Sequence, residues 1–322
     1  MRGARASAWL AGICAANLLW GSPAGGAEAF ITDQTGDEVG VLDLGSKQVV
    51  ARIPVLGKPA GIAMARDGRT AYVTSTEGKY VSVIDAASRN IVAKIAIPDT
   101  PLGIAADPAG RFIYIYVAGF YRPRLYKIDL AAGAIVATVE VGASPSGVAS
   151  TPDGALIVTA DRDDNQISII DAKTFARKGT VKVGAHPFGV TIDPQGARAY
   201  MADVESNDVS VVDLAGEKLL GSVAVGKRPY AVALAKGRGF STDQYGGTVS
   251  VFDLATLRPV KWIPVGDYPE GIETSADGNR VYVVNWFSNE VWAIDAETLA
   301  VTAKMPAGDG PRAFGTFLRE AL

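Results

Sequence analysis

A histidine, a glutamate and an arginine each stand beside a proline of a repeated Gly-x-x-Pro phrase in this chain. His186 and Arg228 each precede a proline of that phrase, and Glu270 follows one. Such a group can act as a general acid–base set if the fold brings the three side chains into one pocket. The same residue types also bind anionic ligands without catalysis. Close convergence of the three favours an enzyme, and separation around a rim favours a binding protein.

Aromatic and basic residues are also frequent near these prolines. This combination suits a planar, anionic or nucleotide-like ligand, held by ring stacking and by charge-assisted hydrogen bonds. Loop packing is the alternative role for any one of them. The predicted ligand-binding residues are Lys58, Phe120, Tyr121, Arg122, His186, Phe188, Arg228, Tyr230, Tyr245, Tyr268, Glu270, Trp286 and Arg312, with Phe287 beside them.

Four aspartates, Asp33, Asp161, Asp203 and Asp243, form a second series of possible ligands. Carboxylates gathered near one axis can bind a hard cation such as calcium. Aspartates at strand ends more often cap the following turn, so both roles stay open. With a single histidine, and Cys14 as the only cysteine, no transition-metal site and no cofactor is predicted.

The spacing of the prolines shows which elements must position these residues. They fall at 59, 101, 145, 187, 229, 269 and 311, at intervals of 40 to 44 residues. A second series, an apolar residue followed by aspartate, runs from Asp43 to Asp295 with the same intervals. A period of this length with strand-like content is typical of a β-propeller. We therefore predict an all-β, seven-bladed propeller over residues 28–322.

Each repeat divides into four short strands separated by turn residues, as 61–63, 71–74, 81–85 and 91–95 illustrate. Only residues 312–322 follow the last proline, whereas three strands near 30–33, 39–43 and 49–53 precede the first. The last blade is therefore expected to combine one C-terminal strand with three N-terminal strands, which removes open sheet edges. We expect no helix in the mature chain.

The register also predicts that the varied residues share one face. The proline begins the innermost strand, and the second strand runs back antiparallel, so both meet at the end that carries the proline loops. Two extra residues within 118–124 lie at this end, and the two missing residues near 236–238 lie at the other. Rigid scaffolds present binding residues on loops, so the ligand or partner is expected at this face.

The first 27 residues read as a secretory signal peptide. Arg2 and Arg5 precede the apolar stretch 6–20, and small residues follow it. Removing both arginines changes the net charge from −3 to −5, which argues against bulk electrostatic binding to nucleic acid or anionic membranes. We expect a periplasmic or secreted monomer with no membrane segment after cleavage.

The repeat resembles the YVTN-repeat β-propellers, whose familiar members are YncE-like periplasmic proteins. The phrases that carry it are Ala71 to Ser75, Val81 to Asp85 and Tyr282 to Asn285. The resemblance implies a non-catalytic binding or scaffold protein for a small ligand or a periplasmic protein, with single-stranded DNA among the family's ligands. Related propellers imply two alternatives, a lactonase-like or lyase-like enzyme and an accessory protein of a periplasmic quinoprotein or haem enzyme.

Overall fold

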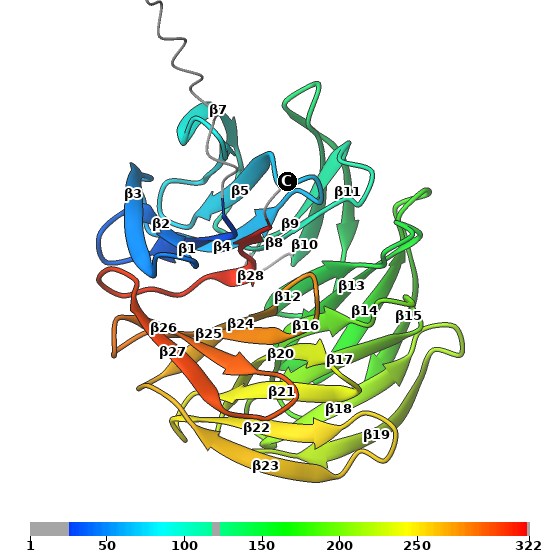
Figure 1. Cartoon of the computed structure of the whole chain (residues 1–322). Coiled ribbons are helices and arrows are strands. Elements are labelled where there is room, and N and C mark those ends of the chain that lie inside the picture. The colour runs from blue at the N-terminus through cyan, green and yellow to red at the C-terminus, as the bar shows by residue number, and fades with distance from the viewer. Residues whose placement is uncertain (1–25, 118–122, 321–322) are drawn as a thin grey trace, which may run out of the picture.

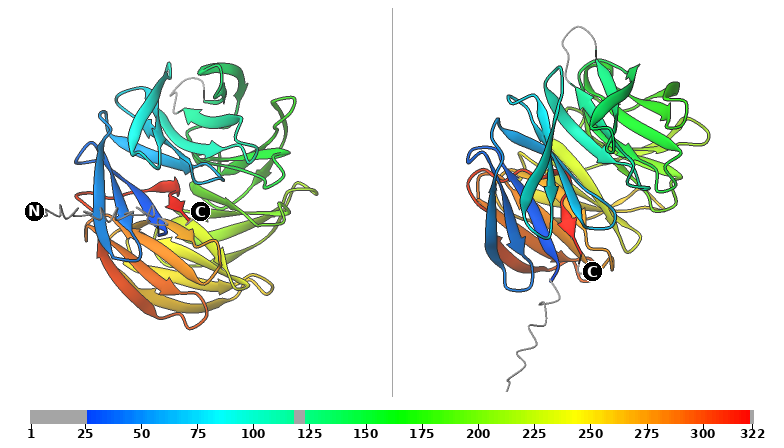
Figure 2. Two further views of the ribbon diagram at one scale, coloured as in Figure 1. Left: turned by 45° about the horizontal axis from the view of Figure 1, so that its top comes forward. Right: turned by 90° about the horizontal axis from the view of Figure 1, so that it is seen from above.

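Seven antiparallel sheets surround one axis in the computed structural model, which describes residues 26–117 and 123–320 (Figures 1 and 2). The innermost strands are β4 (Pro59–Met64), β8 (Pro101–Ala106), β12 (Pro145–Ser150), β16 (Pro187–Ile192), β20 (Pro229–Ala235) and β24 (Pro269–Thr274). The second strands are β1 (Glu28–Asp33), β5 (Thr70–Ser75), β9 (Phe112–Val117), β13 (Leu156–Asp161), β17 (Arg198–Asp203), β21 (Arg238–Asp243) and β25 (Arg280–Asn285).

The third and outermost strands complete each sheet. The third strands are β2 (Glu38–Asp43), β6 (Tyr80–Asp85), β10 (Arg124–Asp129), β14 (Gln166–Asp171), β18 (Asp208–Asp213), β22 (Thr248–Asp253) and β26 (Glu290–Asp295). The outermost strands are β3 (Gln48–Pro54), β7 (Asn90–Ala96), β11 (Ala134–Glu140), β15 (Ala176–Lys182), β19 (Lys218–Ala224), β23 (Pro259–Pro264) and β27 (Val301–Pro306). The predicted seven-bladed propeller is confirmed. Its helical content in the described part is a single 3-10 turn, Arg162–Asp164.

Both chain ends build one blade, as predicted. Strand β29 (Leu318–Arg319) pairs with β1, and the sheet order is β29-β1-β2-β3. The C-terminal segment also crosses to the next blade, because β28 (Phe314–Thr316) pairs in parallel with β4 (Figure 1). The C-terminal segment therefore pairs with two blades, through β29 and β28, and it leaves no unpaired edge where the ring closes.

Close approach of the innermost strands explains their small residues. A Cβ atom added to Gly147 would stand 2.3 Å from the carbonyl oxygen of Phe188, and one added to Gly61 would stand 2.1 Å from that of Leu102. Farther from the axis, apolar side chains of adjacent sheets form the core, with Tyr114, Tyr200 and Phe240 among the largest fully buried ones. The aspartates from Asp43 to Asp295 cap the turns before the outermost strands, as predicted; for example, Ser88 donates its N–H to Asp85 at 2.7 Å.

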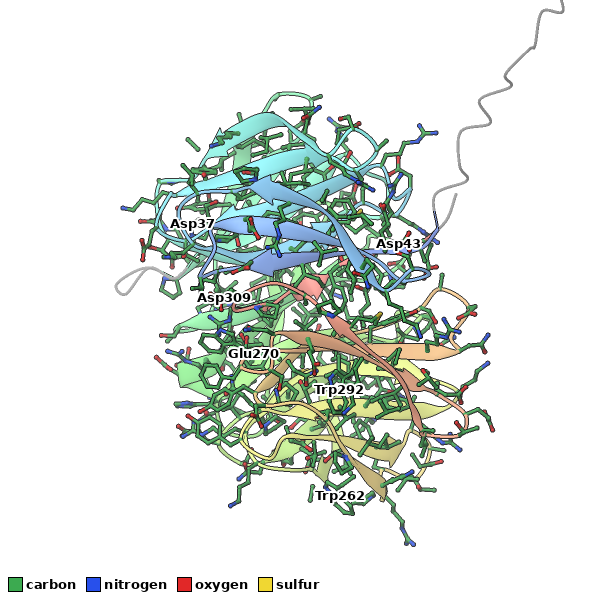
Figure 3. The ribbon with its side chains drawn as sticks, turned by 60° about the vertical axis from the view of Figure 1, so that its left-hand side comes forward. Asp37, Asp43, Trp262, Glu270, Trp292 and Asp309 are labelled. Carbon is green, nitrogen blue, oxygen red and sulfur yellow. The ribbon has the colours of Figure 1, made fainter. Side chains whose placement is uncertain are left out.

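Two faces follow from this topology. The proline face carries the loops that lead into the innermost strands and the turns after the second strands. The turn face carries the hairpin turns between these two sets of strands. In Figure 3 the proline face lies to the left, with Asp37, Glu270 and Asp309, and Asp43 lies on the opposite side.

Candidate functional site

Six of the seven residues that precede the prolines adopt an unusual backbone conformation, and Thr100 is the exception. Lys58, His186, Arg228 and Tyr268 have φ values of 60°, 55°, 56° and 54°. A left-handed conformation is uncommon for residues other than glycine, and the neighbouring proline restricts the backbone further. Their varied side chains thus stand on a backbone geometry that repeats from blade to blade.

A hydrogen bond from the preceding blade fixes this conformation. The N–H groups of Lys58, His186 and Arg228 donate to the side chains of Asp37, Asn165 and Asn207, at 2.8, 2.9 and 2.8 Å. Because this contact uses only the backbone N–H, it places no demand on the side chain of the residue before the proline. The position can therefore vary without weakening the contact between blades, as a binding surface requires.

Four rings from two adjacent blades form an aromatic patch on the proline face: Tyr245, Tyr268, Trp286 and Phe287. The ring centroids are 5.2 Å apart for Tyr245 and Tyr268, 4.4 Å for Tyr268 and Phe287, and 4.9 Å for Trp286 and Phe287. Tyr245 and Phe287 remain 56% and 58% exposed. Such a contiguous exposed aromatic surface is typical of a recognition site.

Two arginines border the aromatic patch. The guanidinium carbon of Arg228 lies 5.3 Å from the centroid of Tyr245, and that of Arg312 lies 4.3 Å from the centroid of Trp286. Both distances fall within the range of cation–π attraction. The patch therefore offers aromatic faces beside the exposed guanidinium of Arg228, which suits a ligand that carries both a ring and a negative charge.

Arg312 is also part of a buried ion pair. Its Nε and Nη2 donate to the two carboxylate oxygens of Glu270 at 2.7 and 2.9 Å, and its Nη1 donates to Gln34 at 2.9 Å. Glu270 is fully buried and also accepts from the Gln244 amide at 2.6 Å. This network joins the C-terminal segment to β24 and to the N-terminal turn after β1, so Glu270 serves ring closure.

The possible catalytic set does not assemble. His186 Nδ1 lies 3.2 Å from the carboxylate of Glu205, and Arg228 lies 3.9 Å from the same group. Glu270 is instead buried against Arg312. His186 and Arg228 thus meet at an exposed carboxylate, apart from the third member. By the criterion set above, this separation favours a binding protein.

The other predicted ligand residues lie in three places. Phe188 and Tyr230 pack with Phe314 at the start of the innermost strands, with centroids 4.4, 5.0 and 5.6 Å apart. Lys58 lies on the proline face, in the loop before β4. The predicted ligands Phe120, Tyr121 and Arg122 lie outside the described residues, as does the predicted signal peptide except for residues 26 and 27.

The aspartate series bonds to nearby turns and strands. Asp161 accepts from the hydroxyls of Thr159 and Ser168, at 2.8 and 2.6 Å. Asp243 accepts from Ser250 at 2.7 Å. Burial raises the pKa of Asp203 to about 7 and that of Asp243 to about 6. In the described chain no three histidine, cysteine, aspartate or glutamate residues stand together as a metal-binding group.

A cavity of about 870 Å³ occupies the channel at the turn face. The second halves of the innermost strands and the turns after them line it, and Phe314 lies at its inner end. Because the cluster of Phe188, Tyr230 and Phe314 fills the proline end of the channel, the open volume lies at the other end. Sequence reasoning missed this cavity. One signal existed, since Glu273 is the only charged residue four positions after a proline of the series.

Comparison with known proteins agrees with this architecture. The model of the YNCE-like beta-propeller family matches residues 26–111, which include β1 to β8, and the later blades repeat the same strand pattern. Over residues 26–111 the chain is similar in sequence to YncE-like β-propellers. No curated protein matches the sequence.

Two solved structures resemble this propeller in fold. A functionally unknown protein from Desulfotomaculum acetoxidans is 15% identical, with a TM-score of 0.77 over 88% of this chain and 98% of that one. Kuenenia stuttgartiensis hydrazine synthase is 20% identical, with a TM-score of 0.70 over 80% of this chain and 89% of that one. At these identities the likeness concerns the fold alone. Among the described residues, no helix is long and apolar enough to cross a bilayer.

Proposed function

We propose that this propeller is a non-catalytic binding protein of the periplasm or the secreted fraction. Its proline face would bind a ligand that combines an aromatic ring with a negative charge, as nucleotides and single-stranded DNA do. The aromatic patch between Arg228 and Arg312 carries the proposal. Bases stack on exposed rings and contribute about 1–3 kcal/mol each, while guanidinium groups contact phosphates.

The fold supports a recognition role for this face. Tyr245 and Tyr268 stand on separate loops, and Trp286 and Phe287 lie in the turn between β25 and β26. The strands behind these loops are rigidly paired in four-stranded sheets, so the rings are held near one another before a ligand arrives. Such preorganisation lowers the entropic cost of binding.

The proposal is tested by fluorescence anisotropy with a labelled oligothymidylate of about ten nucleotides. Phe287→Ala and Tyr245→Ala are the informative variants, because both rings are more than half exposed and their removal leaves the core unchanged. Each is expected to weaken binding about 5-fold to 150-fold, the range that about 1–3 kcal/mol of stacking implies. Arg228→Ala should weaken binding and reduce its salt dependence.

Trp262→Ala supplies the matched control. Trp262 is 51% exposed, but it belongs to the outermost strand β23 (Figure 3). Its loss should leave the affinity unchanged. Equal affinity of the Phe287→Ala and Tyr245→Ala variants and the parent chain would refute the aromatic patch as the binding surface. If a captured protein partner depends on the same rings, and neither oligonucleotide nor nucleotides bind, the surface is a protein-docking site instead.

A further inference from the structure

The cavity at the turn face is a second binding site candidate, separate from the aromatic patch. Its volume of about 870 Å³ lies in the range of small-molecule pockets, about 300–1,000 Å³. Its wall consists mainly of small and aliphatic residues of the innermost strands, such as Ala149, Val190 and Ile272. A molecule with an apolar body therefore fits this wall.

Most hydroxyl groups of the wall already have partners. Ser150, Thr191 and Thr274 donate to the carbonyl oxygens of Ala106, Val232 and Leu234, at 3.1, 2.5 and 3.1 Å. These three bonds join neighbouring blades. The polar specificity of the cavity must therefore come chiefly from its charged groups.

Those charged groups are predominantly acidic. The lining includes the carboxyl groups of Asp67, Asp107, Glu273 and Glu320, and one guanidinium, that of Arg66. Asp107 is 8% exposed, and Glu320 accepts the N–H of Ala276 at 2.7 Å. Asp67, Asp107 and Glu320 outnumber the one cation and give the mouth of the channel a negative potential, which attracts cations and repels anions; Glu273 adds to it when ionised.

Glu273 is the group within the wall that most needs an explanation. Six of the seven blades have alanine, threonine or glycine at its position: Ala63, Ala105, Ala149, Thr191, Ala233 and Gly315. Its Oε2 accepts the N–H groups of Phe317 and Leu318 at 2.5 and 2.8 Å. Glutamine would accept the same two bonds through its carbonyl oxygen. Holding the C-terminal segment thus requires an acceptor at this position, but not an ionisable one.

We infer that the turn-face cavity binds a cationic amphiphile, a molecule with an apolar body and an ammonium group, and that Glu273 pairs with the ammonium. The apolar wall would receive the body, and the acidic lining would select the charge. This inference does not depend on the proposed function of the proline face, because the two sites lie at opposite ends of the channel.

Proton linkage supplies a readout that a purely structural glutamate would not give. Burial, and then the nearby charge of Glu320, raise the pKa of Glu273 to about 8, although the two N–H groups oppose this. Asp67, Asp107 and Arg66 are the other charged groups of the lining. An ammonium ligand favours the carboxylate, so binding should release a proton near pH 7 and should strengthen as the pH rises from 6.5 to 8.5.

The test uses isothermal titration calorimetry of the whole chain with three molecules that share an indole ring: tryptamine, tryptophol and indole-3-acetate. Tryptamine should bind at least about tenfold more tightly than indole-3-acetate. The attraction of a charge pair at an effective dielectric constant near 20 is larger than the free-energy difference that a tenfold change in affinity requires. Glu273→Gln should lower the affinity for tryptamine about tenfold, remove its pH dependence and leave tryptophol within about twofold.

Three further variants locate the site. Ala149→Trp places a bulky ring on the wall of the cavity and should weaken tryptamine binding. Glu297→Gln, an exposed carboxyl on the turn face outside the lining, and Phe287→Ala, in the aromatic patch, should leave it unchanged. The inference is overturned if indole-3-acetate binds as tightly as tryptamine, if Glu273→Gln has no effect, if Phe287→Ala abolishes binding, or if no tryptamine binds at millimolar concentration.

Discussion

Removal of the Arg312 side chain should destabilise the whole ring. Arg312 makes two hydrogen bonds to the fully buried carboxylate of Glu270 and a third to Gln34, while only 20% of its own side chain is exposed. Removing one partner of a buried ion pair costs about 3–5 kcal/mol, because the remaining charge stays buried without compensation. Arg312→Ala should therefore lower the free energy of unfolding by about that amount.

Urea unfolding followed by circular dichroism measures this loss of unfolding free energy. An exposed ion pair in the same blade serves as the control. Arg52 pairs with Glu38 on β2, but its side chain is 53% exposed. Exposed pairs contribute about 0–1 kcal/mol, so Arg52→Ala should change the free energy of unfolding by less than about 1 kcal/mol. The difference between the two arginine variants isolates the effect of burial.

A double variant tests the cause of the loss. If the unpaired carboxylate is responsible, Glu270→Gln combined with Arg312→Ala should be more stable than Arg312→Ala alone. The glutamine removes the buried charge, and Gln244 can still donate to its carbonyl oxygen. Arg312→Ala no more destabilising than Arg52→Ala, or a double variant less stable than both single ones, would refute the reasoning.

Two further predictions concern the buried aspartates and the closed blade. The pKa of Asp203 is raised from 3.8 to about 7 in the folded chain, so protonation favours folding. Its contribution is fully present below pH 3.8 and is lost as pH rises through 7. The urea midpoint should therefore rise on acidification from pH 8 to pH 5, and Asp203→Asn should reduce that rise; an unchanged slope would contradict the assignment. Removing residues 312–322 or 28–33 should release the same strands, β2 and β3, to hydrogen exchange, and different patterns would contradict the shared blade.

The blade that contains Asn285 indicates that asparagine is tolerated at the position that Asp203 occupies in its own blade. Asn285 stands where the other blades have Asp161, Asp203 or Asp243, and it is fully buried. Asp203 Oδ1 has no hydrogen-bond partner among the described residues, so no donor stabilises the ionised carboxylate at that oxygen. A loss of stability in Asp203→Asn at every pH would thus come from geometry, and only the slope with pH reports the charge.

The register of the sequence was enough to predict the blades, the closure and the proline face. Each of these depends on the order of strands along the chain, which a repeat of fixed period records directly. The partners of Glu270 and His186 could not be predicted in this way. Both flank prolines, so the repeat makes them look equivalent. Only the closing segment from Pro311 onward brings Arg312 beside Glu270, and the contact spans 42 residues of sequence.

The cavity escaped prediction for a related reason. The sequence indicates that small residues surround the axis, but it does not show at which end larger rings fill the channel. Phe188, Tyr230 and Phe314 come from three blades, and their contact depends on the ring being closed. Once they fill the proline end, a channel formed by seven equivalent strands becomes asymmetric. The two ends therefore differ in chemistry, with exposed rings at the proline face and an apolar cavity with carboxyl groups at the turn face.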